Sequence, residues 1–152
     1  MDERREDTPR CIFCRIVAKE APASIVYEDD VTLCLMTIGP VNRGHAMVIP
    51  KQHAASLAEL DEATWEHVSR VARRLAQAIR ESGVRCEGVN LFLADGEAAF
   101  QDVFHLHLHV FPRFKGDPFK LEADWSVKPP RTELDAVATQ IRRAYERRYG
   151  HA

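Results

Sequence analysis

The sequence predicts an α+β fold, a five-stranded antiparallel sheet with two main helices on one side. Three observations support this class. Five short apolar runs are separated by turn residues, and one longer run repeats its apolar positions every three or four residues. The links between consecutive strands are short, which favours antiparallel pairing because parallel neighbours need a long crossover.

The first third of the chain predicts a short helix or turn followed by three strands. Residues 11–20 place their apolar side chains on one side, and Pro22 ends that segment. Strands are expected over residues 25–27, 31–36 and 46–49. The polar turn at 28–30 makes a hairpin of the first two, and Pro50 stops the third.

A long amphipathic helix is expected over residues 61–82. Asp61 suits the N-cap and Gly83 the C-terminal stop. His67 lies one position off the apolar stripe, which predicts a solvated side chain. The stripe itself consists of Trp65, Val68, Val71, Leu75 and Ile79.

Two more strands and a last helix complete the predicted fold. Strands are expected over 89–93 and 104–111, the second ended by Pro112. An irregular loop over 116–130 leads to a helix that begins near Thr132, where Asp135 closes a capping-box-like pair.

Length and charge exclude several classes of protein. The 152 residues suit a flexible, charged tail over 1–10 and a single domain over 11–152 that includes the C-terminal loop and helix. A net charge of −2 gives no general attraction to nucleic acid or acidic membranes. We expect a cytoplasmic protein, because neither a secretory signal nor a membrane-spanning run is visible.

Four cysteines occur, and a cytoplasmic chain is not expected to use them as a disulfide framework. Cys34 lies in an apolar run and is read as a buried thiol, and Cys86 as an isolated loop thiol. Cys11 and Cys14 form a C-x-x-C pair. On its own this pair fits two inert thiols, a redox pair or half of a metal site, although no βαβ pattern favours redox chemistry.

Three histidines alternate with apolar residues in His105-Leu106-His107-Leu108-His109-Val110-Phe111. On a strand the apolar side chains would face a core, while the three imidazoles would share the other face about 6.6 Å apart. Such rings can serve as nucleophile, proton shuttle, phosphate binder or metal ligand. Two alternatives are simply satisfied histidines and an H-x-H metal site, for which Asp102 is the only nearby carboxylate.

These residues resemble the histidine triad (HIT) family, whose motif is His-φ-His-φ-His-φ-φ with φ apolar. Other segments match the family in the expected order, and the tail with Trp125 is similar to the bacterial branch. The matching segments are Cys11-Ile12-Phe13-Cys14, Tyr27-Glu28-Asp29-Asp30, Arg43 to Lys51, Gln101-Asp102-Val103 and Pro112-Arg113. The resemblance implies a HIT-like fold and a purine nucleotide or conjugate as ligand.

The resemblance also implies catalytic roles. His107 would attack the α-phosphorus to form a nucleotidyl-histidine, and a neutral imidazole is a competent nucleophile near pH 7. His109 would hold a phosphate oxygen or pass a proton to the leaving group, with His45 in support. Gln101 would reach the bridging oxygen, and backbone N–H groups at Asp102 and Val103 would cradle the phosphate.

Further residues are assigned by the same resemblance. The nucleobase would lie against Ile12, Phe13, Ile16, Leu35 and Ile38, with Thr37 at the ribose, although such apolar residues are core in most proteins. Cys11, Cys14, His53 and His105 would hold a structural Zn²⁺. The alternative for this quartet is two buried thiols with His53 exposed after Pro50.

The chain departs from the common family pattern at four positions. Thr37 stands where many members carry an Asp for the ribose, and Ala94 where an Asn often contacts the phosphate. Phe100 replaces a Gly and is poorly suited to positive φ, and Asp102 replaces a Ser. A carboxylate at position 102 would repel a phosphate if it faced inward.

Three functions are therefore weighed. The first is a HIT hydrolase or transferase acting on nucleoside phosphoramidates, nucleotidyl-sulfates or dinucleoside polyphosphates. The second is a catalytically weak nucleotide-binding or interaction module stabilised by zinc. The third is a metal-dependent hydrolase. The resemblance also implies a homodimer, for which the helix 61–82 and the strand 89–93 are the candidate surfaces, and no nucleic-acid or membrane partner.

Overall fold

The computed structural model describes residues 11–150, so the predicted tail at 1–10 lies outside the described residues. The described chain falls into two compact units, one ending at Phe119 and one beginning at Lys120. The first unit holds the sheet and the three alternating histidines His105, His107 and His109. The second holds helix α3, and each unit is described by itself.

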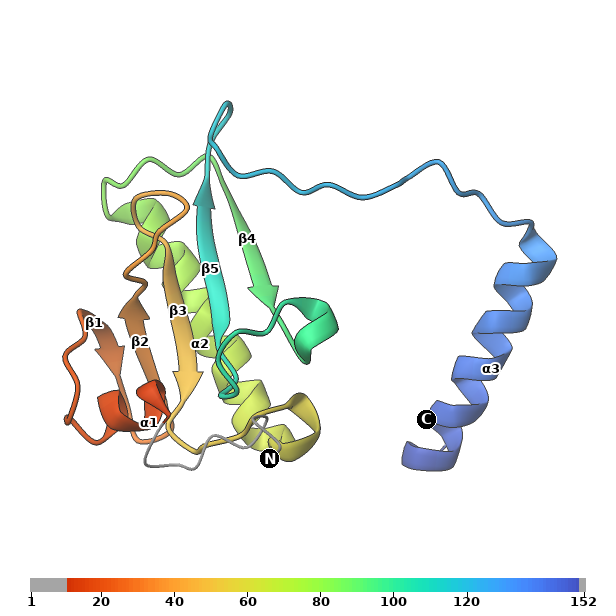
Figure 1. Ribbon diagram of the computed structural model, residues 1–152, viewed down its shortest axis with the longest axis horizontal. Coiled ribbons are helices and arrows are strands. Elements are labelled where there is room, and N and C mark those ends of the chain that lie inside the picture. Colours follow the sequence, from red (N-terminus) through yellow and green to blue (C-terminus); the bar gives the residue numbers. More distant parts are fainter. Residues whose placement is uncertain (1–10, 151–152) are drawn as a thin grey trace. The chain divides into compact units, whose positions relative to one another are not determined.

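The sheet has five antiparallel strands, which confirms the predicted architecture. Strand β3 is the middle strand, and β5, which carries His109, lies between β3 and the edge strand β4. The order is β1-β2-β3-β5-β4 (Figure 1). The strands span Ile25–Glu28 (β1), Thr32–Met36 (β2), Ala46–Pro50 (β3), Gly88–Leu93 (β4) and Leu108–Arg113 (β5).

Helix α2 (Glu62–Glu81) covers one face of this sheet (Figure 1). The Asp61 side chain accepts from the backbone N–H of Thr64, which confirms the predicted N-cap, and Gly83 follows the helix with φ +83°. Burial of the helix stripe against the strands forms the main core. Its buried members include Val68, Val71, Leu75 and Ile79 from α2 and Cys34, Val48, Leu108 and Val110 from the strands.

Helix α1 (Ile12–Val17), the short helix expected within residues 11–20, packs on the face of the sheet opposite α2. Side chains alternate along a strand, which turns Leu33, Leu35 and Met47 away from α2. These side chains form a second cluster with Cys11 and Phe13. A short helix before the first strand can pack on either face, and the local sequence does not decide which.

Strand β5 begins and ends later than predicted. It starts at Leu108, so His105 and His107 lie in the bend that leads into the strand. There the N–H of Leu106 bonds to the carbonyl of Ala54 instead of a strand partner. Pro112 lies inside the strand. Its carbonyl points to the β3 side, beyond the last residue pair of β3 and β5, and accepts a hydrogen bond from Asn42 Nδ2 there. The missing proline N–H therefore costs no ladder hydrogen bond.

Helix α3 spans Arg131–Tyr149 and begins after Pro130, with no side-chain cap, so the predicted capping-box pair does not form. None of its residues is buried, and its apolar stripe of Leu134, Val137, Ile141 and Tyr145 is exposed. Within residues 11–150 we find no helix with the length and apolar character needed to cross a bilayer.

His67 is not the solvated residue that the helical pattern predicted. Its Nε2 lies 2.8 Å from Oδ2 of Asp29, a residue of the β1–β2 turn. Asp29 also accepts from the N–H groups of Val31 and Thr32 and from Tyr27 Oη. Burial alone would raise the pKa of Asp29, but the hydrogen bonds from His67, Thr32 and Val31 outweigh it and lower the pKa. This carboxylate therefore ties the hairpin to α2.

The Asp29 contacts predict a pH-dependent stability. The folded pKa is depressed, so the stabilisation is present above the unfolded pKa of about 4 and is lost as the pH falls below it. Asp29→Asn should lower the free energy of unfolding by about 1–3 kcal/mol at pH 7, and by less at pH 3.5. Urea unfolding at both pH values measures this, with the exposed neighbour Asp30→Asn as control. A penalty of equal size at both pH values would contradict it.

Candidate active site and metal centre

His107 is buried, with 4% of its surface exposed, and lies directly before β5. Its Nδ1–H donates to the carbonyl of His105 over 2.8 Å. The ring centroid of Phe13 lies 5.2 Å away and packs against the imidazole. The hydrogen bond fixes the tautomer, so the lone pair in the neutral ring is on Nε2. That nitrogen is the one available for nucleophilic attack.

His45 and His109 are joined directly through their rings. Nε2 of His45 lies 2.9 Å from Nδ1 of His109, and Nδ1 of His45 accepts from the backbone N–H of Val41. Neutral His45 therefore carries its proton on Nε2 and donates it to His109. His109 in turn carries its proton on Nε2. The chain of hydrogen bonds thus presents an N–H donor beside His107, whose ring centroid lies 4.8 Å from that of His109.

Burial keeps this pair uncharged near neutral pH. It lowers the pKa of His45 to about 4. It also lowers the pKa of His109 to about 4, with His107 and His45 adding to the effect and Asp102 opposing it. A neutral imidazole both accepts and donates a proton, whereas an imidazolium only donates. The pair is therefore suited to relay protons.

Aromatic packing holds the two rings in place. Phe111, two residues along β5, stacks on His109 with centroids 5.4 Å apart and planes at 16°. The same phenyl ring lies 4.2 Å from His45. Phe92 on the neighbouring β4 pairs with His109 across the sheet. The pairing of β5 with its neighbouring strands thus places the imidazoles of His45 and His109 against the phenyl rings of Phe111 and Phe92.

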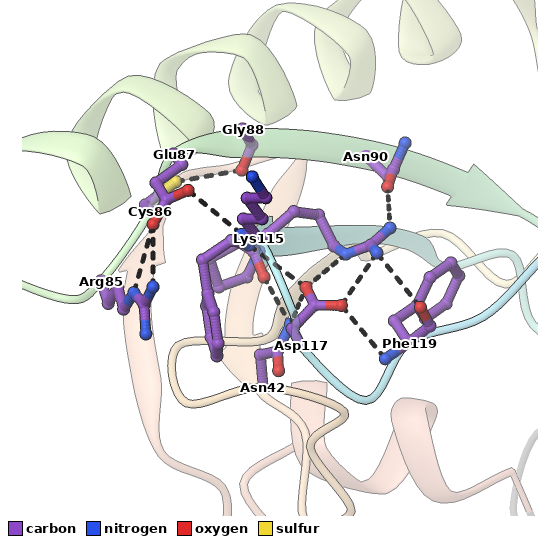
Figure 2. Close-up of polar contacts among 12 residues, drawn as sticks. Asn42, Arg85, Cys86, Glu87, Gly88, Asn90, Lys115, Asp117 and Phe119 are labelled. Carbon is purple, nitrogen blue, oxygen red and sulfur yellow. Dashed lines mark hydrogen bonds and ion pairs between the residues drawn. The ribbon is translucent and has the colours of Figure 1, made fainter.

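A polar network fixes the loop that carries His45 (Figure 2). Asp117, whose side chain is 2% exposed, accepts from Arg113 Nε at 2.6 Å and from Asn42 Nδ2 at 2.8 Å. The carbonyl of Asn42 accepts from the N–H of His45. Gly44, between them, has φ +93°, and a Cβ there would lie 2.8 Å from Val84 Cγ1. Only glycine fits this turn.

The side chain of Gln101 points at backbone groups. Its Oε1 accepts from the N–H of Gly96 at 2.7 Å, and its Nε2 donates to the carbonyls of Ala55 and Val103. Gln101 is buried and holds three segments of chain together at the entrance to the histidine bend. Its catalytic role stays a prediction, and these bonds give it a scaffolding role in this structure.

Asp102 is brought beside His107. Its Oδ1 lies 3.5 Å from His107 Nε2 and accepts from the N–H of Val103 at 2.9 Å. The carboxylate is 82% exposed, so it stands at the solvent side of the imidazole. The backbone N–H of Val103 is engaged by this carboxylate, which occupies one of the donors expected to cradle a phosphate.

The predicted nucleobase residues divide into two groups. Phe13, Ile16 and Leu35 belong to the cluster beneath α1, and Phe13 also contacts His107. Ile12 is 41% exposed, and Ile38 is fully exposed. The first group forms a floor next to the histidines, while the second contributes no packed surface. Thr37 is half-buried, and its N–H bonds to the carbonyl of His45.

Cys11, Cys14, His53 and His105 converge on one point. Nδ1 of His105 lies 3.4 Å from Cys11 Sγ and 3.5 Å from Cys14 Sγ, and Nδ1 of His53 lies 3.3 Å from Cys14 Sγ. All four ligand atoms lie within 4.8 Å of one another. Cys14 in α1 and His105 in the bend before β5 meet here, 91 residues apart along the chain.

The geometry of this quartet fits a tetrahedral metal ion. Bonds of about 2.3 Å to sulfur and 2.0–2.1 Å to nitrogen place S and N ligands about 3.5 Å apart, close to the observed separations. His105 Nε2 donates to the carbonyl of Pro50 at 2.8 Å, which leaves the Nδ1 lone pair facing the sulfurs. Burial lowers the pKa of His105 to about 4, so the ring is neutral, as a metal ligand must be.

Several contributors to the site have no clear signal in the sequence. Val41 acts through its backbone N–H, which any residue except proline would supply. Asn42 and Asp117 are far apart in sequence and meet only in the fold. Phe111 is apolar like its neighbours, and only the fold reveals that its ring contacts the imidazoles of His45 and His109.

Comparison with known proteins agrees with this fold and site. The HIT domain family model matches residues 18–116. An uncharacterized HIT-like protein of Borreliella burgdorferi is 44% identical over 110 residues, 72% of this chain and 79% of that protein. An adenosine 5′-monophosphoramidase of Schizosaccharomyces pombe is 32% identical over 132 residues, 86% of this chain and 95% of that protein.

A solved structure also carries the fold. The Zn-bound histidine triad family protein from Mycobacterium smegmatis superimposes with a TM-score of 0.72 and 42% identity, over 91% of this chain and 99% of that one. The histidine bend, the sheet and these matches define a histidine triad architecture. The chain belongs to the histidine triad family.

Phe100 provides a test of backbone strain at the entrance to this site. It has φ +66° and ψ +29°, a left-handed conformation that a β-carbon disfavours, and its side chain is 84% exposed. Phe100→Gly should therefore be more stable than Phe100→Ala by about 0.5–1 kcal/mol. Chemical denaturation compares the two variants, which lose the same phenyl ring. Equal stabilities would contradict the strain.

Proposed function

We propose that the protein is a nucleotidyl hydrolase or transferase that cleaves at the α-phosphorus of nucleoside phosphoramidates or (di)nucleoside polyphosphates. The observation that carries the proposal is the tautomer of His107. Its Nδ1–H is held by the His105 carbonyl, so Nε2 has a lone pair beside a proton donor on His109. Relatives that include a monophosphoramidase support the reaction class.

The first step is a displacement at phosphorus. Nε2 of His107 forms a bond to the α-phosphorus as the bond to the leaving group breaks. The electron pair of that bond goes to the leaving atom, which takes the proton from Nε2 of His109. A proton from solvent replaces the one that the His45–His109 pair has given, because two neutral imidazoles that lose a proton would otherwise leave an imidazolate. The products are a nucleotidyl-His107, the free leaving group and a neutral imidazole pair.

The second step releases the nucleotide. A water molecule, or another acceptor in a transferase, bonds to phosphorus and loses its proton to the imidazole pair. The P–Nε2 bond breaks, and its electrons return to His107. The imidazole pair returns that proton to solvent, so the histidines finish as they began and the cycle is balanced for protons. Dividing one displacement into two lets a buried neutral pair serve as acid and then as base.

The nucleoside binds, in this proposal, next to the triad on the face away from α2. Phe13, Ile16 and Leu35 form the apolar floor for the purine. The ribose lies near Thr37, which offers a single hydroxyl instead of a carboxylate. Ala94 is buried and apolar and gives the phosphate no hydrogen bond. Contacts to the sugar and phosphate are therefore few.

We also propose that the Cys11, Cys14, His53 and His105 quartet binds a structural Zn²⁺. A closed set of two sulfurs and two nitrogens leaves no open position for substrate. The ion would supply cross-linking of the N-terminal segment to the bend before β5. His105 and His107 are separated by one residue, so this link would steady the carbonyl that sets the His107 tautomer.

The candidate surfaces for a homodimer lie on α2 and β4. A groove of about 680 Å³ lies between α2 and β4 and is lined by Arg73, Gln77, Val89 and Leu91. Both candidate surfaces for a homodimer border this groove, and Leu91 is exposed. The homodimer, the purine preference and the cytoplasmic location stay predictions.

His107→Ala should abolish turnover of adenosine 5′-phosphoramidate, with kcat falling at least about 1,000-fold, because no other group can form the covalent intermediate. His67→Asn is the control, since it changes an imidazole on α2 outside the site. Mass spectrometry of the wild type quenched during turnover should show an adenylyl adduct on a peptide containing His107.

Turnover by His107→Ala at the wild-type rate would contradict the mechanism. Micromolar AMP binding by calorimetry without any turnover of the wild type would favour the binding module instead. The motive for this second function is the loss of polar contacts at Thr37 and Ala94.

Cys14→Ser should lower bound zinc from about one ion per chain and lower the melting temperature, because a tetrahedral site needs all four ligands. Cys86→Ser is the matched control. Its thiol is half-buried and donates to the carbonyl of Gly88, outside the quartet. Metal analysis and thermal unfolding of both variants measure the effect. Loss of activity on chelation with an unchanged melting temperature would point to a catalytic ion.

A further inference from the structure

We infer that Asp102 selects the leaving group, favouring substrates whose α-phosphorus is bonded to an N–H over substrates whose leaving group is a phosphate or sulfate anion. The inference deepens the proposed function and rests on it. It concerns a position where this chain carries a carboxylate and the common family pattern a hydroxyl.

Asp102 is fixed at the point where substrate meets His107. Its Oδ1 lies 3.5 Å from His107 Nε2 and is held there by the N–H of Val103. Its Oδ2 forms no hydrogen bond with any residue in 11–150, and the side chain is 82% exposed. An α-phosphorus that approaches Nε2 therefore passes within a few ångströms of a carboxylate with a free acceptor.

The bridging atom decides what this carboxylate can do. In a phosphoramidate the bridging nitrogen carries a hydrogen, so its N–H can donate a hydrogen bond to an ionised carboxylate. In a phosphoanhydride or a nucleotidyl-sulfate the bridging oxygen carries none, and the carboxylate has no hydrogen to offer in return. Asp102 can thus bond the first kind of leaving group and only repel the second.

The surroundings do not offset that repulsion. Oδ1 of Asp102 lies 3.5 Å from Nε2 of the neutral His107, and no lysine or arginine of the described chain forms an ion pair with the carboxylate. The nearby His45 and His109 are buried and uncharged near neutral pH. A polyphosphate leaving group with two or more negative charges would meet a further negative charge with no cation beside it.

The same carboxylate suits the departing amine. When Nε2 of His107 bonds to phosphorus, the electron pair of the P–N bond goes to nitrogen and His109 supplies its proton. Nitrogen then carries at least two hydrogens, and an alkyl amine gains a further proton from solvent. Both products are hydrogen-bond donors to Asp102, so the interaction strengthens as the bond breaks.

The test compares two substrates on four proteins. Adenosine 5′-phosphoramidate and diadenosine tetraphosphate are assayed with the wild type, Asp102→Asn, Asp102→Glu and the exposed control Asp30→Asn. For Asp102→Asn, kcat/KM should rise for the tetraphosphate and fall for the phosphoramidate. The ratio between them should shift about tenfold, the size expected for one like charge several ångströms away. Asp102→Glu should keep most of the preference, and Asp30→Asn all of it.

The failures are distinguishable. A ratio unchanged within twofold in Asp102→Asn, with an active wild type, overturns the inference and leaves the proposed function intact. A wild type that hydrolyses neither substrate overturns the proposed function and the inference with it. Circular dichroism of Asp102→Asn checks folding, which an 82% exposed side chain is not expected to affect.

Discussion

The hydrogen bond from Nδ1 of His107 to the carbonyl of His105 determines which ring nitrogen of His107 keeps a lone pair. The carbonyl belongs to a residue whose own ring is fixed at both nitrogens, one facing Pro50 and the other facing the two sulfurs. A rotation of residue 105 would move the acceptor and free the His107 ring to choose the other tautomer. The chemistry of residue 107 therefore depends on the anchoring of residue 105.

That dependence explains why a cysteine pair at the start of the chain matters to a strand near its other end. Cys11 and Cys14 flank the first turn of α1, and Phe13 between them packs on both His105 and His107. The thiols hold the ring of the first histidine while the phenyl ring holds the second. The residues at the start of α1 thus hold the histidine bend in place, on the face of the sheet that α2 does not cover.

Local patterns predicted the parts of the fold that local physics decides. The 3.6-residue period and the caps of α2 were confirmed, and so was the burial of Leu106, Leu108 and Val110. The start of β5 was wrong because alternation is also satisfied by an extended bend, and only pairing with β3 and β4 defines the strand. The side taken by α1 and the contact of His67 with Asp29 depend on tertiary packing, which one sequence does not display.

The site separates its chemistry from its charge. The two histidines to which we assign proton transfer, His45 and His109, lie behind Phe111 and Phe92, where desolvation keeps them neutral. The charged group, Asp102, is on the rim, where water screens it until a substrate enters. Burying that carboxylate would carry a desolvation penalty. It would also affect the neutral pair, because the charge of Asp102 already raises the pKa of His109 against the larger effect of burial. A charge at the rim acts on the incoming molecule most strongly when the molecule has displaced the water between them, which is the moment at which selection between leaving groups takes effect.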